Sequence, residues 1–142
     1  MSIPENEALV SAVYTRVLQE RAEGHDLSAP EQMVYEVEML GQEVNGGASF
    51  EQYFRWATLA EIRQAAARLE ELGLPEPARI TRDAVRAAFP GGMPASEAGM
   101  GEVGAWTPAQ EACLGELAAA YAGYNGAITN ALAAWYRRAT GA

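Results

Sequence analysis

Apolar residues recur at intervals of three and four along most of the chain, which is the spacing of one face of an α-helix. Val10, Val13 and Val17 begin this pattern, and Met33 and Val37 continue it in the next segment. No segment shows the strict alternation that is typical of a β-strand. The pattern therefore predicts an all-α fold. The predicted helices cover residues 5–23, 29–44, 49–56, 59–72, 76–89, 108–123 and 127–139.

Four of these helices begin at a capping-box pattern, in which Ser or Thr is followed three residues later by Glu or Gln. The side chain of the Ser or Thr accepts a hydrogen bond from the backbone N–H three residues later. The side chain of the Glu or Gln accepts one from the backbone N–H of the Ser or Thr. Gly46 lies where a left-handed residue would end the second helix. Gln52 is expected to be the capping partner of Ser49. The four matching segments are Ser28–Glu31, Ser49–Gln52, Thr58–Glu61 and Thr107–Gln110.

Residues 91–106 are rich in Gly and contain few large apolar side chains. This composition predicts a long flexible loop that lies over the core, with Met100, Val103 and Trp106 as its anchors. The helices before and after the loop are each too small a group to form a core alone. We therefore expect residues 1–142 to form a single domain, a compact bundle of about six or seven helices.

The charge is distributed unevenly along the chain. The sequence contains 19 acidic residues and 10 basic ones, all of them Arg, for a net charge of −9. Residues 1–51 hold ten acidic and two basic residues, so this first third carries −8. Such a charge repels nucleic acid and attracts basic surfaces. The alternative is that the carboxylates form a solvated face that serves solubility.

Catalytic and metal-binding patterns are missing from the sequence. His25 is the only histidine and Cys113 the only cysteine, so neither a histidine pair nor a cysteine cluster could hold a metal. No apolar run approaches the ~20 residues of a membrane span, and the first residues lack the pattern of a secretory signal. The sequence predicts a cytoplasmic protein that is not an enzyme, with no cofactor, no metal and no membrane contact.

The carboxylates of the second predicted helix form two stripes in which the residues are seven apart, a rise of about 10 Å. Both stripes are expected to flank an exposed side of this helix, opposite Val37 and Leu40. DNA phosphates repeat every ~3.4 Å along one strand, so such a row could imitate a phosphate array. Further carboxylates from the preceding helix and turn would extend it. The candidate partner-binding surface is Glu20, Glu23, Asp26, Glu31, Glu36, Glu38 and Glu43.

Aromatic residues cluster just after the second helix. Phe50, Tyr53 and Phe54 have the spacing of core residues in a short helix. Alternatively, Tyr53 or Trp56 is exposed and forms an anchor for a protein partner. A third interpretation is a small-molecule pocket lined by Tyr35, Tyr53 and Trp56.

The segment 43–54, with the sequence EVNGGASFEQYF, resembles the signature of a small bacterial domain family that is named after a DNA-mimic protein. That signature has a Glu, an Asn-Gly-Gly turn, a Phe and then Gln-Tyr-Phe, after a helix that starts with Glu-Gln-x-x-Tyr. Glu31, Gln32 and Tyr35 match the helix start, and Glu43 the first Glu. Ala48-Ser49 are inserted here, and Trp56 stands where Asn is usual. The structural signature residues are Asn45, Gly46, Gly47, Phe50, Gln52, Tyr53 and Phe54.

The resemblance implies a non-enzymatic, acidic, all-helical protein that occupies the basic groove of a DNA-binding protein and does not itself bind nucleic acid. The partner would be a basic protein. Two alternatives stay open: an immunity or antitoxin-like interaction module, and a small-molecule-binding domain. A homodimer is also left open.

Overall fold

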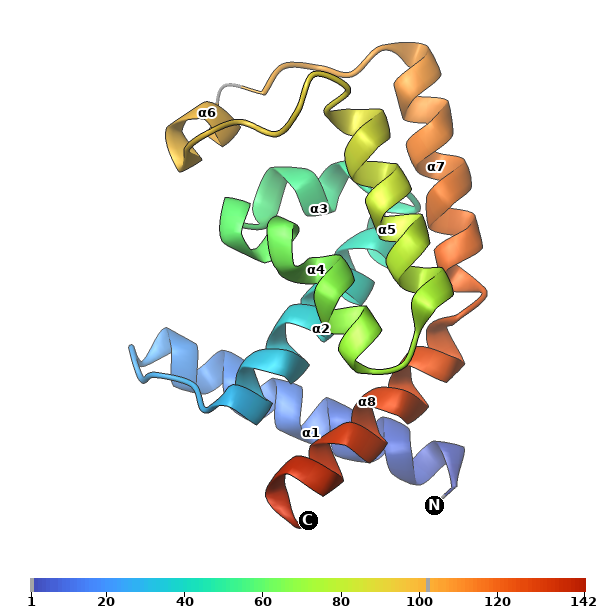
Figure 1. The fold of residues 1–142 in the computed structure, drawn as a ribbon. Coiled ribbons are helices and arrows are strands. Elements are labelled where there is room, and N and C mark those ends of the chain that lie inside the picture. The colour runs from blue at the N-terminus through green and yellow to red at the C-terminus, as the bar shows by residue number, and fades with distance from the viewer. Residues whose placement is uncertain (1, 102) are drawn as a thin grey trace.

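The computed structural model describes residues 2–101 and 103–142, and this part of the chain is all-α (Figure 1). The predicted fold class is confirmed. Eight helices are present among the described residues, one more than predicted, because a short helix forms inside the expected loop. The helices are α1 (Ile3–Ala22), α2 (Ala29–Gly47), α3 (Glu51–Trp56), α4 (Leu59–Glu71), α5 (Pro75–Ala88), α6 (Glu97–Gly101), α7 (Pro108–Ala122) and α8 (Asn125–Thr140).

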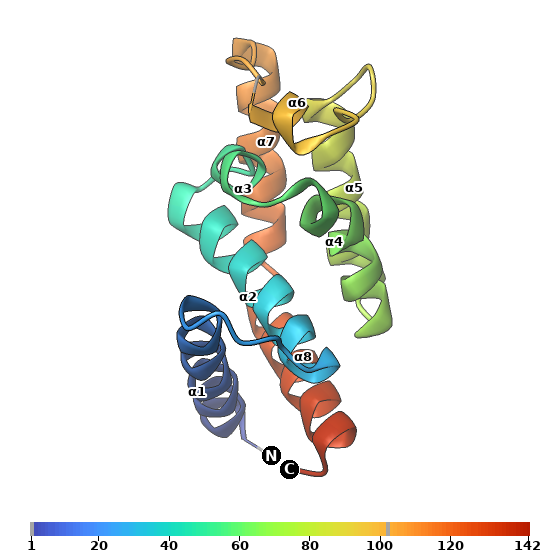
Figure 2. The same cartoon turned by 90° about the vertical axis from the view of Figure 1, so that its left-hand side faces the viewer.

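Helix α2 connects the two ends of the molecule. At one end it packs against α1 and α8, which also contact each other (Figure 2). At the other end it contacts α3, α4 and α7, and α5 packs against both α4 and α7. Because it has neighbours on several sides, α2 is the central helix of the bundle.

The central position of α2 removes the exposed side that the sequence predicts for it. Eight of its 19 residues are buried, and they include Met33, Val34, Val37, Leu40 and Val44. Consecutive positions such as these point in different directions around a helix. The expectation of a free carboxylate-bearing side opposite Val37 and Leu40 is therefore wrong.

The aromatic residues of the segment 43–54 form part of the core. Phe50, Tyr53 and Phe54 are all buried. Phe50 meets the ring of Tyr121 edge-on at 5.8 Å between centroids, and Phe54 meets Phe89 in the same way at 5.4 Å. This edge-to-face geometry is favourable for aromatic pairs. The core interpretation of these three residues is confirmed.

The end of α2 differs from the prediction. The helix continues through Gly47, and the left-handed residue is Ala48, with φ of 51°. Gly46 is therefore an ordinary helical position, and its assignment as the left-handed cap is wrong. A non-glycine residue adopts this conformation at a cost of about 1–2 kcal/mol, which the packing of the flanking segments has to offset.

The start of α3 also differs from the prediction. The hydroxyl of Ser49 accepts a hydrogen bond from the backbone N–H of Glu51 at 3.2 Å, and Gln52 takes no part in a capping box there. The side-chain amide of Gln52 donates instead to the Oε2 atom of Glu43, at 2.5 Å. The proposed Ser49–Gln52 box is wrong, and the signature glutamine links α3 to α2.

The other three capping boxes are confirmed, at the starts of α2, α4 and α7. A further box, Ser2 with Glu5, starts α1. In the segment 91–106, Trp106 is buried, and its indole N–H donates to the carbonyl of Ala88 at 3.0 Å. The predicted tryptophan anchor is confirmed, since this bond ties the segment to the end of α5.

Candidate functional site

Four of the predicted partner-binding residues lie together where α1 ends and α2 begins. We call Glu20, Glu23, Asp26 and Glu31 the acidic end. Glu23 and Asp26 are exposed, and the other two are half-buried. Residues 16–31 contain these four acids and two arginines, so the local net charge is −2 with histidine counted as neutral.

Part of the acidic end has a structural role. The guanidinium of Arg16 lies 3.7 Å from a carboxylate oxygen of Glu20 and 3.7 Å from one of Glu31. The backbone N–H of Ser28 donates to Glu31 at 2.9 Å, and this bond is the main reason that the pKa of Glu31 is lowered. The pKa of Glu20 is raised, chiefly by a hydrogen bond with Glu31. Glu31 is thus a cap for α2 as well as a surface carboxylate.

Glu36 does not belong to a surface. It is 4% exposed, and its Oε2 atom accepts hydrogen bonds from Arg68 at 2.8 Å and from Gln32 at 3.0 Å. Its prediction as a partner-binding residue is wrong because α4 covers this side of α2 and supplies the arginine. A stripe pattern within one helix cannot reveal that a second helix brings a counter-charge to it.

Glu38 and Glu43 point to different neighbours. Glu38 is half-buried and lines cavities between α2, α1 and α8. Burial raises the pKa of Glu38, and a hydrogen bond with Gln42 opposes that rise. Glu43 accepts a hydrogen bond from Gln52 of α3. It lies twelve residues after Glu31 on the same helix, which corresponds to about 18 Å along the helix axis. The seven predicted carboxylates therefore do not form one continuous surface.

A cavity of about 180 Å³ lies between α2 and the segment where α7 meets α8. Glu38 and Tyr121 both line it, together with Asn45 and Asn125. The hydroxyl of Tyr121 is buried and has no hydrogen-bond partner among the described residues. The sequence contains no signal for this site, because the residues that form it come from segments about 80 positions apart. We call it the Glu38 cavity.

The predicted small-molecule pocket is not formed. Tyr35 and Tyr53 are buried in the core, whereas Trp56 is 73% exposed. Trp56 lines a hollow with Phe54, Met100 and Val103, and neither Tyr35 nor Tyr53 lines that hollow. The alternative prediction for Trp56, an exposed aromatic residue, is confirmed, whereas Tyr53 is not exposed.

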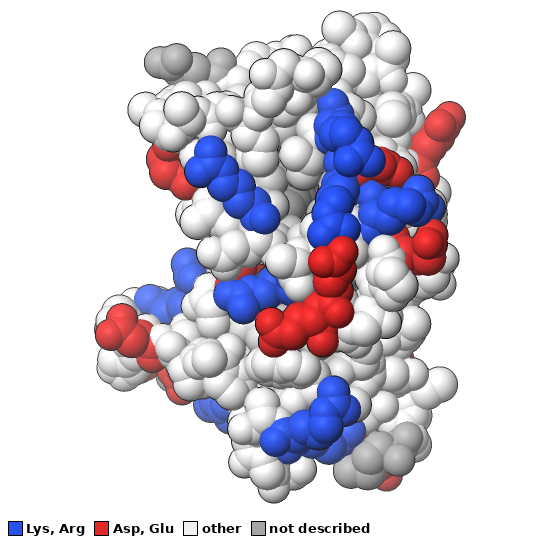
Figure 3. Space-filling model, in the orientation of Figure 1, with Lys and Arg blue, Asp and Glu red and all other residues white. Residues whose placement is uncertain are grey.

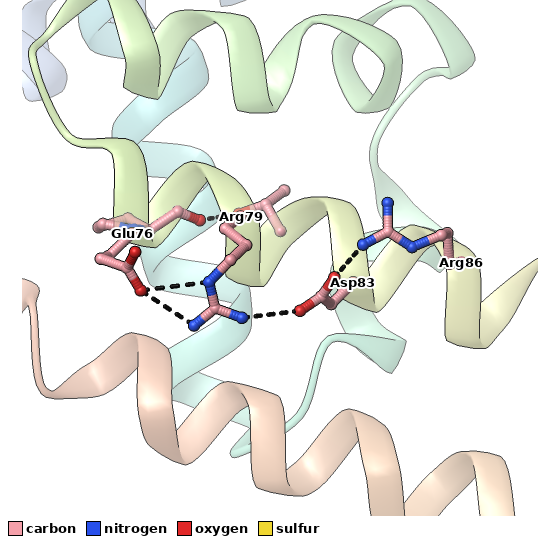
Figure 4. Close-up of polar contacts among 6 residues, drawn as sticks. Glu76, Arg79, Asp83 and Arg86 are labelled. Carbon is pink, nitrogen blue, oxygen red and sulfur yellow. Dashed lines mark hydrogen bonds and ion pairs between the residues drawn. The ribbon is translucent and has the colours of Figure 1, made fainter.

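Positive charge gathers elsewhere on the molecule. Figure 3 shows arginine side chains over α4 and α5 with carboxylates among them. On α5, Arg79 bridges Glu76 and Asp83, with nitrogen–oxygen distances of 3.0 Å to each, and Arg86 pairs with the same Asp83 (Figure 4). These pairs lie three or four residues apart, which is the spacing of neighbours on a helix surface. Helix α5 holds three arginines and two carboxylates, so it carries a net charge of +1, unlike the acidic first third of the chain.

Two further properties of the described ranges, 2–101 and 103–142, bear on chemistry. No three His, Cys, Asp or Glu side chains there come together in a way that could hold a metal ion. In the same ranges, no helix has both the length and the apolar character needed to cross a membrane.

The fold and these features define a small all-α domain whose negative charge is concentrated in its first third, which contains α1, α2 and the connection between them. Residues 25–139 match the family model described as DMP19-like protein, and the chain belongs to this family. The segment 31–54, which carries the sequence resemblance, falls inside the matched region. Comparison with curated proteins finds no match, and comparison with solved structures finds none either.

Proposed function

We propose that this protein is a non-enzymatic acidic binding protein that acts as a DNA mimic on a basic partner, a DNA-binding protein. The observation that carries the proposal is the separation of charge in the fold. Residues 1–51, with a net charge of −8, include α1, α2 and the connection between them. The arginines of α4 and α5 pair with carboxylates of those same two helices in most cases, so they leave this negative charge largely uncompensated.

The family name supports the same function, since it refers to a DNA mimic. Within the acidic end, the exposed Glu23 and Asp26 are the carboxylates best placed to meet a partner. Glu36 is left out of the proposed surface because it is neutralised inside the protein by Arg68. The attraction between exposed charges weakens with added salt, so partner binding should depend steeply on ionic strength.

The test is a pull-down from lysate of the native cells at low salt, followed by elution with double-stranded DNA. We expect a basic protein to be captured, released by DNA and lost with the Glu23→Lys, Asp26→Lys double variant. The matched control is Glu71→Lys with Glu116→Lys, two exposed residues on α4 and α7. Both double variants change the net charge from −9 to −5. If both double variants lost capture of the partner equally, total charge, and not the acidic end, would govern capture.

Trp56 favours a second candidate function, an interaction module without mimicry, such as an immunity or antitoxin-like protein. Its indole is 73% exposed beside a hollow of about 220 Å³ that Phe54, Met100 and Val103 also line. Tryptophan is enriched among residues that dominate binding at protein interfaces. In this case Trp56→Ala would abolish capture of a partner that DNA does not release. Ile3→Ala, at another exposed apolar residue, is the control.

A further inference from the structure

The Glu38 cavity is lined by hydrogen-bonding side chains from three helices. Glu38, Gln42 and Asn45 come from α2, Tyr121 comes from the end of α7, and Asn125 and Thr129 come from α8. An adjoining hollow, also about 180 Å³, shares three of these residues and extends towards α1. The site is thus a recess between α2 and the segment where α7 meets α8, and it extends towards α1.

The charge of the recess is negative and has no counter-charge. Glu38 is the one charged residue among the described residues that line the Glu38 cavity, and the adjoining hollow adds the carboxylate of Glu7. No arginine lines either space. Glu38 is half-buried, and removing a charged carboxylate even partly from water is costly unless a cation lies beside it. Here the pairing cation is missing from the described part of the chain.

Tyr121 gives a second, independent indication of a ligand. Its side chain is 0% exposed, lines the Glu38 cavity, and has a hydroxyl without a hydrogen-bond partner among the residues described. Buried hydroxyls in folded proteins nearly always have such a partner. Burial raises the pKa of Tyr121, so its phenol is neutral. A neutral phenol oxygen can accept a hydrogen bond from a donor that enters the cavity.

The rim of the cavity is held in a defined geometry. Asn45 and Asn125 donate to each other through their side-chain amides, with both nitrogen–oxygen distances 3.2 Å. Each amide oxygen keeps a second lone pair, which can accept another hydrogen bond. Apolar side chains, Val37 and Ile128, complete the lining. The Glu38 cavity therefore presents one carboxylate, amide and hydroxyl groups that can both donate and accept, and an apolar wall.

We propose that the Glu38 cavity receives the guanidinium group of an arginine side chain from the protein partner. This inference rests on the proposed function and names the anchor of that interaction. A guanidinium has five N–H donors and no acceptor, so it can bond the acceptor oxygens of this lining, among which the carboxylate of Glu38 carries the charge. It remains charged at all relevant pH values and can donate in a fork to Glu38. The aliphatic stem of arginine can lie against Val37 and Ile128, as such stems do on apolar surfaces.

The first test uses no protein partner. The full ¹⁵N-labelled chain is titrated with N-acetyl-arginine amide, and its backbone amide signals are followed by NMR. We expect saturable shifts at Gly41, Asn125 and Thr129, which line the cavity. N-acetyl-citrulline amide, an uncharged analogue of similar shape, should produce no such shifts. Equal responses to the two compounds, or no saturable shift at these amides, would overturn the proposal.

Variants then assign the binding to the two central residues. Glu38→Gln should weaken binding of the arginine compound at least tenfold, and Tyr121→Phe severalfold. Glu38→Gln should unfold at a temperature no lower than the parent, because a neutral amide is less costly to bury than a carboxylate. Reduced binding would then not reflect loss of fold. Glu23→Gln, at an exposed residue of the acidic end, is the matched control and should bind normally.

Two further outcomes separate this inference from its alternatives. Equal affinity for N-acetyl-lysine amide would contradict a guanidinium site, because the planar fork of arginine would then make no difference.

The titration does not depend on the pull-down. If arginine binds but the acidic-end variant still captures its partner and DNA does not release it, DNA mimicry fails while the arginine site stands. If the pull-down succeeds and the titration fails, only the arginine site is wrong.

Discussion

Replacing Glu36 by Lys tests the buried position of this carboxylate and, with it, the revised limits of the candidate surface. The variant would place an ammonium group beside the guanidinium of Arg68, whose nitrogen lies 2.8 Å from Glu36. Removing one partner of a buried ion pair typically costs about 3–5 kcal/mol. The side chain of Arg68 is 27% exposed, so water relieves part of that cost. We therefore expect a loss of about 2–4 kcal/mol in the free energy of unfolding.

The assay is urea denaturation followed by circular dichroism. With a urea dependence of about 2 kcal/mol per molar, this loss lowers the midpoint by about 1–2 M. Glu23→Lys introduces the same charge change at an exposed position and should shift stability by no more than about 0.5 kcal/mol. Matching midpoints for Glu36→Lys and Glu23→Lys would refute the ion pair. The Glu36→Leu, Arg68→Leu double variant should recover much of the stability, because replacing both members of such a pair is often near neutral.

The result also decides how mimicry can be tested. A charge-reversed variant that included Glu36 would lose partner binding through partial unfolding, whatever the acidic surface does. Glu23 and Asp26 avoid this difficulty because they are exposed and lie in the connection between α1 and α2. Charge reversal for the pull-down is therefore made at these two positions and not at Glu36.

Four further substitutions should change the stability of the protein in directions that the structure specifies. Gly46→Ala should stabilise the protein by about 1 kcal/mol, because the position is helical and nothing lies within 4 Å of the added Cβ atom. Ala48→Gly should stabilise it by about 1 kcal/mol by relieving a left-handed residue; both can be measured as a rise in Tm. Trp106→Phe should lower the free energy of unfolding by about 1–3 kcal/mol, because it leaves the buried carbonyl of Ala88 without its donor. Urea denaturation measures this loss. Burial raises the pKa of Glu38 in the folded state. The stability linked to its protonation is therefore present below the pKa of the unfolded chain, and it is lost as pH rises through the pKa of the folded protein. Since Gln is neutral at every pH, Glu38→Gln should stabilise the protein more at pH 7 than at pH 4.

Each of these predictions has a clear contradicting result. A lower Tm for Gly46→Ala would mean that Gly46, and not Ala48, adopts the left-handed conformation. An unchanged urea midpoint for Trp106→Phe would mean that the indole does not anchor its segment. Equal effects of Glu38→Gln at both pH values would show that the carboxyl of Glu38 titrates in the folded protein as it does in the unfolded chain. In that case the cavity would not be a desolvated site.

Local features of the sequence are sufficient to predict much of the fold. The three-and-four spacing of apolar residues locates seven of the helices to within a few residues, because helix periodicity depends on neighbours along the chain. Capping boxes such as Thr58 with Glu61 are equally local, since both hydrogen bonds form within one turn. Trp106 is a large apolar residue in a polar segment, and burial is its expected place. The charge of the first third is likewise a property of the sequence alone.

Tertiary packing decides the features that matter most for function. Glu36 and Glu38 are two residues apart on one helix, yet the first is neutralised by Arg68 and the second faces a cavity. Their difference arises from which helix covers each side of α2, and no periodicity within α2 encodes that. The sequence by itself determined an acidic helical bundle. The three-dimensional structure determined which of its carboxylates remain free to bind, because burial and counter-charge come from residues distant in the chain.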